Sequence, residues 1–191
     1  MSDKLKIGVI LSSTRKGRMA EVVHDWFALK TRERDDMAFG LLDLREANLP
    51  FFDEDAPPAA KTPEHAAARA WEEAIQGYDG FIVLTCEYNH SISAALKNAF
   101  DYGYRGWVRK PLGAVGYGGV GAARAVEHLR LIGVNFGMVP VAGAVHIGGA
   151  DFMTLSKTRD PQALGDHLDK SLGALLDDIA WWGKITKAAR G

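Results

Sequence analysis

Short apolar segments alternate with amphipathic segments along the whole chain. Runs rich in β-forming residues occupy five places, residues 5–11, 39–44, 81–85, 112–115 and 138–147. Such runs are typical of parallel strands that are buried on both faces. Apolar residues at helical spacing lie between these runs and after the last of them, at residues 19–27, 64–76, 92–100, 122–133 and 163–185. Strands that alternate with helices predict an α/β fold, with one parallel sheet covered by helices on both faces.

The length and the charge of the chain narrow its class. With 191 residues it fits one domain, spanning 1–191. A formal net charge of −1 argues against nucleic acid or an anionic membrane as the main partner. No apolar run is long enough to cross a bilayer, and the first residues lack the order of a secretory signal. A lone cysteine, and histidines without metal-ligand spacing, predict no disulfide and no metal. We therefore expect a soluble, cytoplasmic protein.

Polar loops follow three of the predicted strands, at residues 12–18, 87–91 and 117–119. The first loop combines hydroxyls, a glycine and basic residues ahead of a helix, which suits a phosphate. An ordinary helix cap with solvated basic side chains explains the same residues. The second loop is polar and aromatic and the third is rich in glycine, and both suit a planar ring. Together the loops predict a mononucleotide, flavin mononucleotide (FMN), at the switch point of a flavodoxin-like sheet.

Two other motifs, a glycine-rich turn and a cysteine at a strand end, do not fit the functions that they resemble. Residues 116–121 satisfy G-x-G-x-x-G, but a dinucleotide fold places that turn after its first strand and an acidic residue at the end of the next strand. Cys86 ends a predicted strand but has no arginine six residues later to bind a phosphate, so we interpret it as a small buried residue. Residues 149–159 are predicted to be irregular, and they have no functional account.

From residue 5 to about residue 148, the chain resembles the NADPH-dependent FMN reductase family, which includes quinone, chromate and azo-dye reductases. The most specific segment is Glu87-Tyr88-Asn89-His90-Ser91-Ile92 with Leu96-Lys97-Asn98-Ala99 and Asp101, which matches the pattern PEYNxSxPxxLKNAxD. Further matches are Ser13-Thr14-Arg15 with Gly17-Arg18, Lys110-Pro111, and Tyr117-Gly118-Gly119 with Gly121 and Arg124. The resemblance implies a flavodoxin-like, doubly wound, five-stranded parallel sheet in the order 2-1-3-4-5.

The same resemblance assigns cofactor-binding residues. They are Ser13, Thr14, Arg15, Arg18, Met19, Glu87, Tyr88, Asn89, Tyr117, Gly118 and Gly119. In the family pattern, the first loop holds the FMN phosphate through Ser13, Arg15 and Arg18. Residues 87–89 line the isoalloxazine and the ribityl chain, and residues 117–119 meet the edge of the ring. The chain departs from the pattern at Ser12, Met19, Cys86 and Ser93. Met19 matters most, because it stands where an asparagine or serine often contacts the phosphate.

The resemblance implies an enzyme that transfers a hydride from NADPH or NADH to bound FMN. Electrons then pass, in a ping-pong cycle, to a small acceptor such as a quinone, free flavin, azo dye or metal oxyanion. The flavin carries the chemistry, so no side chain is predicted to be catalytic. Backbone N–H groups of residues 87–89 and of the glycine loop are expected to stabilise the reduced ring. Trp107 and Tyr104 are candidate walls of the nicotinamide site, or core residues.

A homodimer or homotetramer is also implied, and Trp181 and Trp182 are candidate contact residues. Two alternatives stay open. A flavodoxin-type electron carrier would bind FMN without oxidising NAD(P)H, although such carriers are usually strongly acidic. A scaffold that has lost its cofactor would bind no flavin at all.

Overall fold

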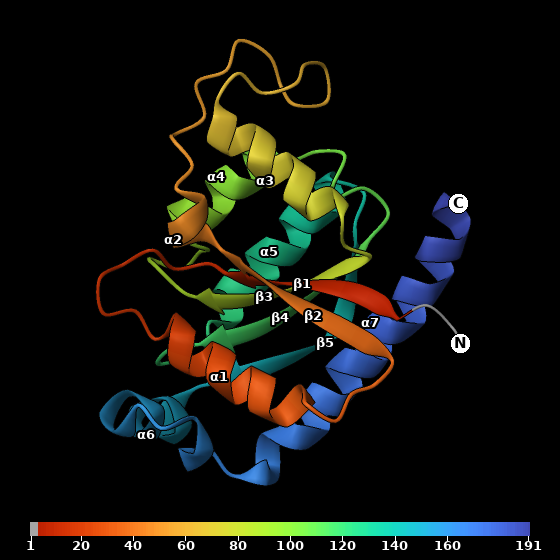
Figure 1. Cartoon of the computed structure of the whole chain (residues 1–191). Coiled ribbons are helices and arrows are strands. Elements are labelled where there is room, and N and C mark those ends of the chain that lie inside the picture. The colour runs from red at the N-terminus through yellow and green to blue at the C-terminus, as the bar shows by residue number, and fades with distance from the viewer. Residues whose placement is uncertain (1–3) are drawn as a thin grey trace.

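The computed structural model describes residues 4–191, which form one sheet flanked by helices (Figure 1). The strands are β1 (Leu5–Leu11), β2 (Met37–Asp43), β3 (Gly80–Cys86), β4 (Pro111–Tyr117) and β5 (Val139–Ile147). The α-helices are α1 (Ala20–Thr31), α2 (Leu44–Ala47), α3 (Ala66–Gln76), α4 (Ala94–Tyr102), α5 (Ala123–Asn135), α6 (Gly149–Thr158) and α7 (Asp169–Arg190). Two short 3-10 helices, Pro161–Ala163 and Asp166–Leu168, connect α6 to α7.

The sheet has the predicted topology. All strand pairs are parallel, and the strand order is β2-β1-β3-β4-β5, which confirms the expected flavodoxin-like arrangement. The chain runs from β1 to β2 at one edge and then crosses back to β3, so the switch point lies between β1 and β3. Leu11 is in register with Leu84, and Cys86 with Tyr117. The loops after β1, β3 and β4 therefore leave the sheet at the same edge.

Two apolar layers enclose the sheet. α1, α6 and α7 cover one face, and α3, α4 and α5 cover the other (Figure 1). Every residue of β3 and β4 is buried, as the continuous apolar runs predicted. Along β3, Ile82 and Leu84 contribute to the layer of α1 and α7, whereas Phe81 and Val83 contribute to the layer of α3 to α5. This alternation follows from the two-residue period of a strand.

The segment after β5 differs from the sequence-based expectation. Residues 149–159 were expected to be irregular, but most of them form α6. Only Leu155 of α6 is buried, and Phe152 is partly buried against the core. Such a narrow apolar stripe gives little periodicity to detect. α7 begins at Asp169 and not at residue 163, because Pro161 and Gly165 accompany two 3-10 turns ahead of it.

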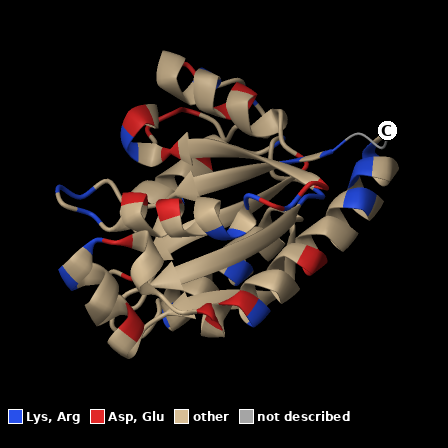
Figure 2. Cartoon of the chain, turned by 60° about the horizontal axis from the view of Figure 1, so that its bottom comes forward, with Lys and Arg blue, Asp and Glu red and all other residues tan. Residues whose placement is uncertain are grey.

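Charged side chains of both signs are interspersed over the helices and loops, and the strands carry few of them (Figure 2). Along the ribbon, residues of the two signs alternate over short distances, in keeping with the near-zero net charge. Within residues 4–191, no helix is both long enough and apolar enough to cross a membrane.

Candidate functional site

The loop between β1 and α1 exposes a row of unused backbone donors. Among the hydrogen bonds of the described residues, none has a backbone N–H of residues 13–17 as its donor. Residues 14–17 are exposed, and Gly17 has a positive φ of 66° that turns the chain toward α1. Free N–H groups ahead of a helix N-terminus form an anion-binding site. The geometry of this loop therefore fits a phosphate group.

Arg18 has a structural role that its sequence position does not reveal. Its side chain is 3% exposed and pairs in bidentate fashion with Asp43 at the end of β2, with Nη1 2.7 Å from Oδ1. Nε also donates to Glu21, and Nη1 to the carbonyl oxygen of Ser13. These hydrogen bonds raise the pKa of Arg18. Burial by itself raises the pKa of Asp43, but the pairing with Arg18 outweighs burial, so the pKa of Asp43 lies below its usual range. Two carboxylates thus already neutralise Arg18, and its contact with the FMN phosphate stays a prediction.

Met19 lies at the N-terminus of α1 without capping it. It is 7% exposed, and no side-chain hydrogen bond caps the helix at this position. An arginine from the end of α6 reaches this point: Nη1 of Arg159 lies 3.2 Å from Sδ of Met19, and Nη2 donates to the carbonyl oxygen of Arg18 at 3.3 Å. No sequence motif marks Arg159, which lies 140 positions from Met19 along the chain.

The loop after β3 contains a tight turn from Tyr88 to Ser91. The backbones of these two residues exchange hydrogen bonds of 3.0 and 3.1 Å, while Asn89 and His90 have φ values of 50° and 69°. Two successive positive φ values are those of a type I′ turn, in which asparagine is favoured. The N–H of Tyr88 is therefore used within the turn. It is not available to the reduced ring, contrary to the sequence-based expectation for this residue.

The Tyr88 side chain connects the first and the second loop. Its hydroxyl lies 2.8 Å from the hydroxyl of Ser13, and 36% of the residue is exposed. Burial raises the pKa of the Tyr88 phenol, so it is neutral and can donate or accept this bond near neutral pH. Behind the loops, Ser93 donates to the carbonyl oxygen of Ser12 and also caps α4. Ser93, which replaces a family proline, thus fixes the same region by hydrogen bonds.

Glu87 points toward α5. Its carboxylate accepts the backbone N–H groups of Arg124 and Ala125 at 3.1 and 3.3 Å, and it pairs with the Arg124 guanidinium. Burial by itself raises the pKa of Glu87, but these donors outweigh burial, so the pKa of Glu87 lies below its ordinary value. The α5 helix needs this cap, because Ala122 at its N-cap has no side-chain acceptor. Glu87 therefore positions the two loops relative to each other, and its contact with the flavin stays a prediction.

The glycines of the third loop divide into two groups. A Cβ on Gly116 would lie 2.2 Å from the carbonyl oxygen of Gly121, and one on Gly121 would lie 2.8 Å from the side chain of His146, so both are needed for packing. Gly118 and Gly119 instead face open space, where no atom lies within 4 Å of an added Cβ. Gly118 has a φ of 143°, which disfavours any side chain. A planar ring can thus approach the backbone at Gly118 and Gly119.

Tyr117 ends β4, directly before Gly118. The residue is 3% exposed, and its hydroxyl has no hydrogen-bond partner. Burial raises the pKa of Tyr117, so this hydroxyl stays a neutral donor. A buried donor without a partner is costly, and it is an observation that fits a polar ligand. The free N–H groups of the first loop and the open backbone at Gly118 and Gly119 fit the phosphate and the ring of FMN.

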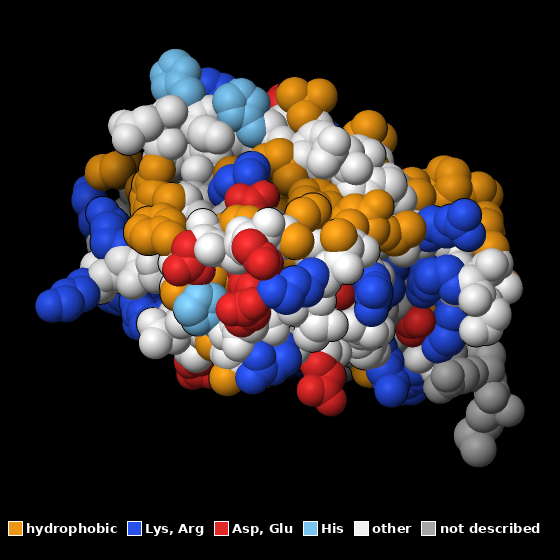
Figure 3. Space-filling view, turned by 90° about the horizontal axis from the view of Figure 1, so that it is seen from above, with side chains coloured by type: hydrophobic (Ala, Val, Ile, Leu, Met, Phe, Trp, Pro, Cys, Tyr) orange, Lys and Arg blue, Asp and Glu red, His pale blue; other side chains and the backbone are white. Residues whose placement is uncertain are grey.

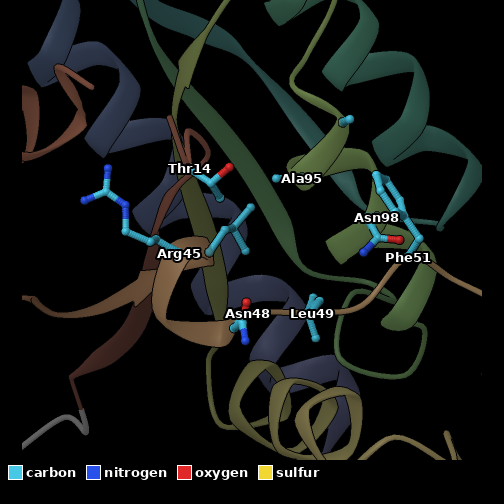
Figure 4. Close-up of a pocket in the computed structure, with 9 residues that line it drawn as sticks. Thr14, Arg45, Asn48, Leu49, Phe51, Ala95 and Asn98 are labelled. Carbon is cyan, nitrogen blue, oxygen red and sulfur yellow. The ribbon is translucent and has the colours of Figure 1, made fainter. Parts of the chain in front are cut away.

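Two pockets adjoin the three loops. Figure 4 shows the first, of about 410 Å³, between the β1–α1 loop, α2 and α4, with Thr14, Arg45, Asn48, Phe51 and Asn98 around it. The second, of about 680 Å³, lies between the Tyr88–Ile92 segment and α5. It is lined by Tyr88, Asn89, Ser91, Ile92, Ala94, Lys97, His128, Leu131 and Ile132. His128 contacts the turn directly, with Nδ1 2.9 Å from Oγ of Ser91.

Trp107, Tyr104 and Cys86 do not belong to the three loops. Trp107 is buried in the core, where its ring packs against Phe81 and Phe100, so it is not a wall of the nicotinamide site. Tyr104 is 39% exposed and contacts Phe136. Cys86 is buried, as expected. In residues 4–191, no group of three or more His, Cys, Asp or Glu side chains is arranged to hold a metal ion.

Known proteins are similar to this chain in sequence and in fold. The model of the NADPH-dependent FMN reductase family matches residues 5–151. An NAD(P)H-dependent FMN reductase from a Nectria species is 38% identical over 132 residues, which cover 65% of this chain and only 65% of that protein. A quinone reductase from Pseudomonas putida is 31% identical over 98% of this chain and 100% of its own.

Solved structures agree on the fold. FerB, a flavoenzyme NAD(P)H:acceptor oxidoreductase from Paracoccus denitrificans, superimposes with a TM-score of 0.69 at 23% identity, over 92% of this chain and 97% of its own. The family match covers β1 to β5 and all three loops. The family predicted from the loops is thereby confirmed, and the chain belongs to the NADPH-dependent FMN reductase family.

Proposed function

We propose that this protein is an FMN-dependent NAD(P)H oxidoreductase that reduces small acceptors of the quinone type. The observation that carries the proposal is the meeting of three loops at one sheet edge. That edge offers free N–H groups at residues 13–17, an unpartnered hydroxyl on Tyr117, and open backbone at Gly118 and Gly119. Family membership and the names of the relatives from Nectria and Pseudomonas putida support the same activity.

FMN, when bound, accepts a hydride from the nicotinamide and passes two electrons to the acceptor. NAD(P)H, a proton and a quinone thereby yield NAD(P)⁺ and a hydroquinone. The protein binds the flavin and orients it. The β1–α1 loop holds the phosphate through its N–H groups, with Ser13, Thr14 and Arg15 beside them. Tyr88, Asn89 and residues 117–119 line the ring, and Glu87 fixes the two ring-binding loops to each other through α5.

The quinone is proposed to enter by the pocket next to Tyr88. This pocket of about 680 Å³ is large enough for a one- or two-ring molecule. Apolar side chains on one wall, Ile92, Leu131 and Ile132, suit a flat ring, while Lys97 and His128 are placed to contact its oxygens. The pocket of Figure 4 lies beside Thr14 and α2, which follows β2, whereas the glycine loop follows β4.

A homodimer is proposed to form across α4 and α5. Leu131 and Val134 on α5 are 70% and 63% exposed, which is high for side chains of this kind in a monomer. Figure 3 shows several hydrophobic patches among charged side chains on the face seen from above. A second copy of the chain placed over α4 and α5 would cover Leu131 and enclose the pocket beside Tyr88. A cytoplasmic location also stays a prediction.

Steady-state kinetics test the proposed activity. The FMN-loaded protein should oxidise NADPH or NADH in the presence of 1,4-benzoquinone, and double-reciprocal plots at several quinone concentrations should be parallel, as a ping-pong cycle requires. Intersecting lines would contradict the ping-pong cycle. An electron carrier would bind FMN but oxidise neither nicotinamide, while a scaffold without cofactor would not take up FMN.

A further inference from the structure

We propose that Arg159 at the end of α6 binds the phosphate of FMN, in place of the donor that Met19 lacks; this inference rests on the proposed function. Arg159 belongs to a segment for which the sequence offered no function. The family model ends at residue 151, so the family pattern does not assign it. Its guanidinium nevertheless touches the loop that precedes α1.

The position of the guanidinium is fixed by two contacts. Nη1 lies 3.2 Å from Sδ of Met19, and Nη2 donates to the carbonyl oxygen of Arg18 at 3.3 Å. Met19 immediately precedes Ala20, the first residue of α1. The charge of Arg159 therefore lies at the N-terminus of α1, the helix that the exposed residues 14–17 precede. An arginine fits a phosphate here because its planar fork can donate two parallel hydrogen bonds to two oxygens.

The arginines around this loop differ in whether a carboxylate already pairs with them. Arg18, the basic residue nearest to Met19, is buried and bound by the carboxylates of Asp43 and Glu21. Arg45 likewise pairs with Glu21. Arg159, in contrast, is exposed and has no carboxylate partner among the ion pairs of the described residues. Its charge is thus free for a ligand, whereas the charge of Arg18 is not.

Arg159 ends α6, and α6 is anchored to the core. Arg159 caps α6 in the left-handed conformation, with a φ of 50°, and its N–H donates to the carbonyl oxygen of Leu155 at 2.9 Å. Leu155 is fully buried and anchors α6 to the core beneath α1. Figure 1 shows α6 beside the start of α1, where the chain leaves the β1–α1 loop. The short helix α6 therefore serves to carry Arg159 to the phosphate site.

Binding of FMN and of riboflavin to the apoprotein tests this role, because riboflavin lacks the phosphate. Flavin fluorescence is titrated for the wild type and for Arg159→Gln, Arg159→Lys and Lys157→Gln. Lys157 is the matched control, since it is an exposed cation of α6. Arg159→Gln should weaken FMN binding about 10- to 100-fold and change riboflavin binding less than about twofold. Arg159→Lys should restore part of the loss, and Lys157→Gln should bind FMN like the wild type.

Other outcomes overturn the inference. Equal weakening of both flavins by Arg159→Gln would show a structural role, and unchanged FMN binding would show no role. A loss confined to the preference for NADPH over NADH would assign Arg159 to the nicotinamide nucleotide instead. If the wild type binds neither flavin, the proposed function fails, and this inference fails with it. Circular dichroism and thermal midpoints verify that each variant is folded.

Discussion

The hydroxyl of Tyr88 lies 2.8 Å from the hydroxyl of Ser13, although 75 positions separate the two residues. This bond joins the loop after β1 to the loop after β3, the two strands on either side of the switch point. In the proposed site, one loop binds the phosphate and the other supplies the aromatic ring. The bond would then set the distance between two parts of the proposed mononucleotide site, at the place where an α/β sheet of this topology binds its ligand.

A double-mutant cycle tests this coupling. Tyr88→Phe and Ser13→Ala each remove one partner and should each weaken FMN binding by about 1 kcal/mol, or roughly fivefold. The double variant should lose much less than the sum, because either change alone already breaks the bond. FMN titrations of the four proteins measure the coupling. Strictly additive losses would show that the two hydroxyls act independently.

Replacement of Asp43 tests the structural role of Arg18. Asp43→Asn leaves the guanidinium buried with a poor partner and should lower the free energy of unfolding by about 3 kcal/mol. Asp55→Asn is the control, because its pair with Lys61 is exposed, and it should change stability by less than about 0.5 kcal/mol. Urea unfolding at pH 7 measures both. Equal effects of the two substitutions would mean that the buried pair adds no more than a surface pair.

The cap on α5 makes stability depend on pH. Glu87→Gln should cost about 1 to 2 kcal/mol at pH 7. The folded state lowers the pKa of Glu87, so the advantage of the wild type is complete above about pH 4.3 and declines as the pH falls through the lowered folded pKa. Urea unfolding of both proteins between pH 3 and pH 7 measures this change. Glu127→Gln, an exposed substitution on the same helix, should show almost no difference from the wild type.

Lys110 predicts a second dependence of stability on pH, in alkaline solution. Its amine is buried, donates to the carbonyl oxygens of Ile75 and Gln76, and lies 5.6 Å from the centre of the Phe81 ring. Burial, and next to it the charge of Arg190, lowers the pKa of Lys110 to about 8. Between pH 8 and about pH 10.4 the unfolded chain therefore binds more protons than the folded one, and the lysine's contribution to stability rises with pH.

Comparison with Lys110→Met isolates this effect, because all other groups titrate alike in both proteins. The free energy of unfolding of the wild type, minus that of the variant, should increase from pH 8 to pH 10 and stay constant between pH 6 and pH 7. Lys157→Met, on the surface of α6, should give a flat difference over the same range. A flat difference for Lys110→Met would contradict the lowered pKa.

The oligomeric state tests the proposed interface on α5. Leu131→Glu should convert the proposed dimer to a monomer, because a carboxylate would be buried in an apolar contact. Trp181→Glu on α7 is the comparison, since Trp181 is also exposed, at 58%. Light scattering coupled to size-exclusion chromatography measures both masses. Dissociation by Trp181→Glu alone would place the interface on α7, and a monomeric wild type would rule out both.

The sequence predicted the sheet well, because the signals for it are local. β3 and β4 are continuous apolar runs, and each loop motif directly follows its strand. The partners of charged side chains were not predictable in this way. Arg18 bonds to Asp43, which is 25 positions away, and Glu87 to Arg124, which is 37 positions away. Both motif residues match the family pattern, yet only the folded chain shows that other groups of the protein occupy their charges.

Arg159 is the clearest case of a residue that sequence cannot reveal. α6 was missed because only Leu155 anchors it, and nothing near residue 159 indicates a contact with Met19. The sequence shows that Met19 departs from the family pattern. It does not show that an arginine from α6 takes the place of the missing donor. For Trp107 the sequence left two roles open, a wall of the nicotinamide site or a core residue, and the structure places it in the core.

The most direct test of the account is anaerobic reduction of the FMN-loaded protein by NADPH, followed by absorbance near 450 nm. We predict that the flavin band bleaches on addition of one equivalent of NADPH and returns when 1,4-benzoquinone is added. A band that persists with NADPH and NADH, but disappears with dithionite, would contradict the account, because the protein would then hold the flavin without accepting a hydride.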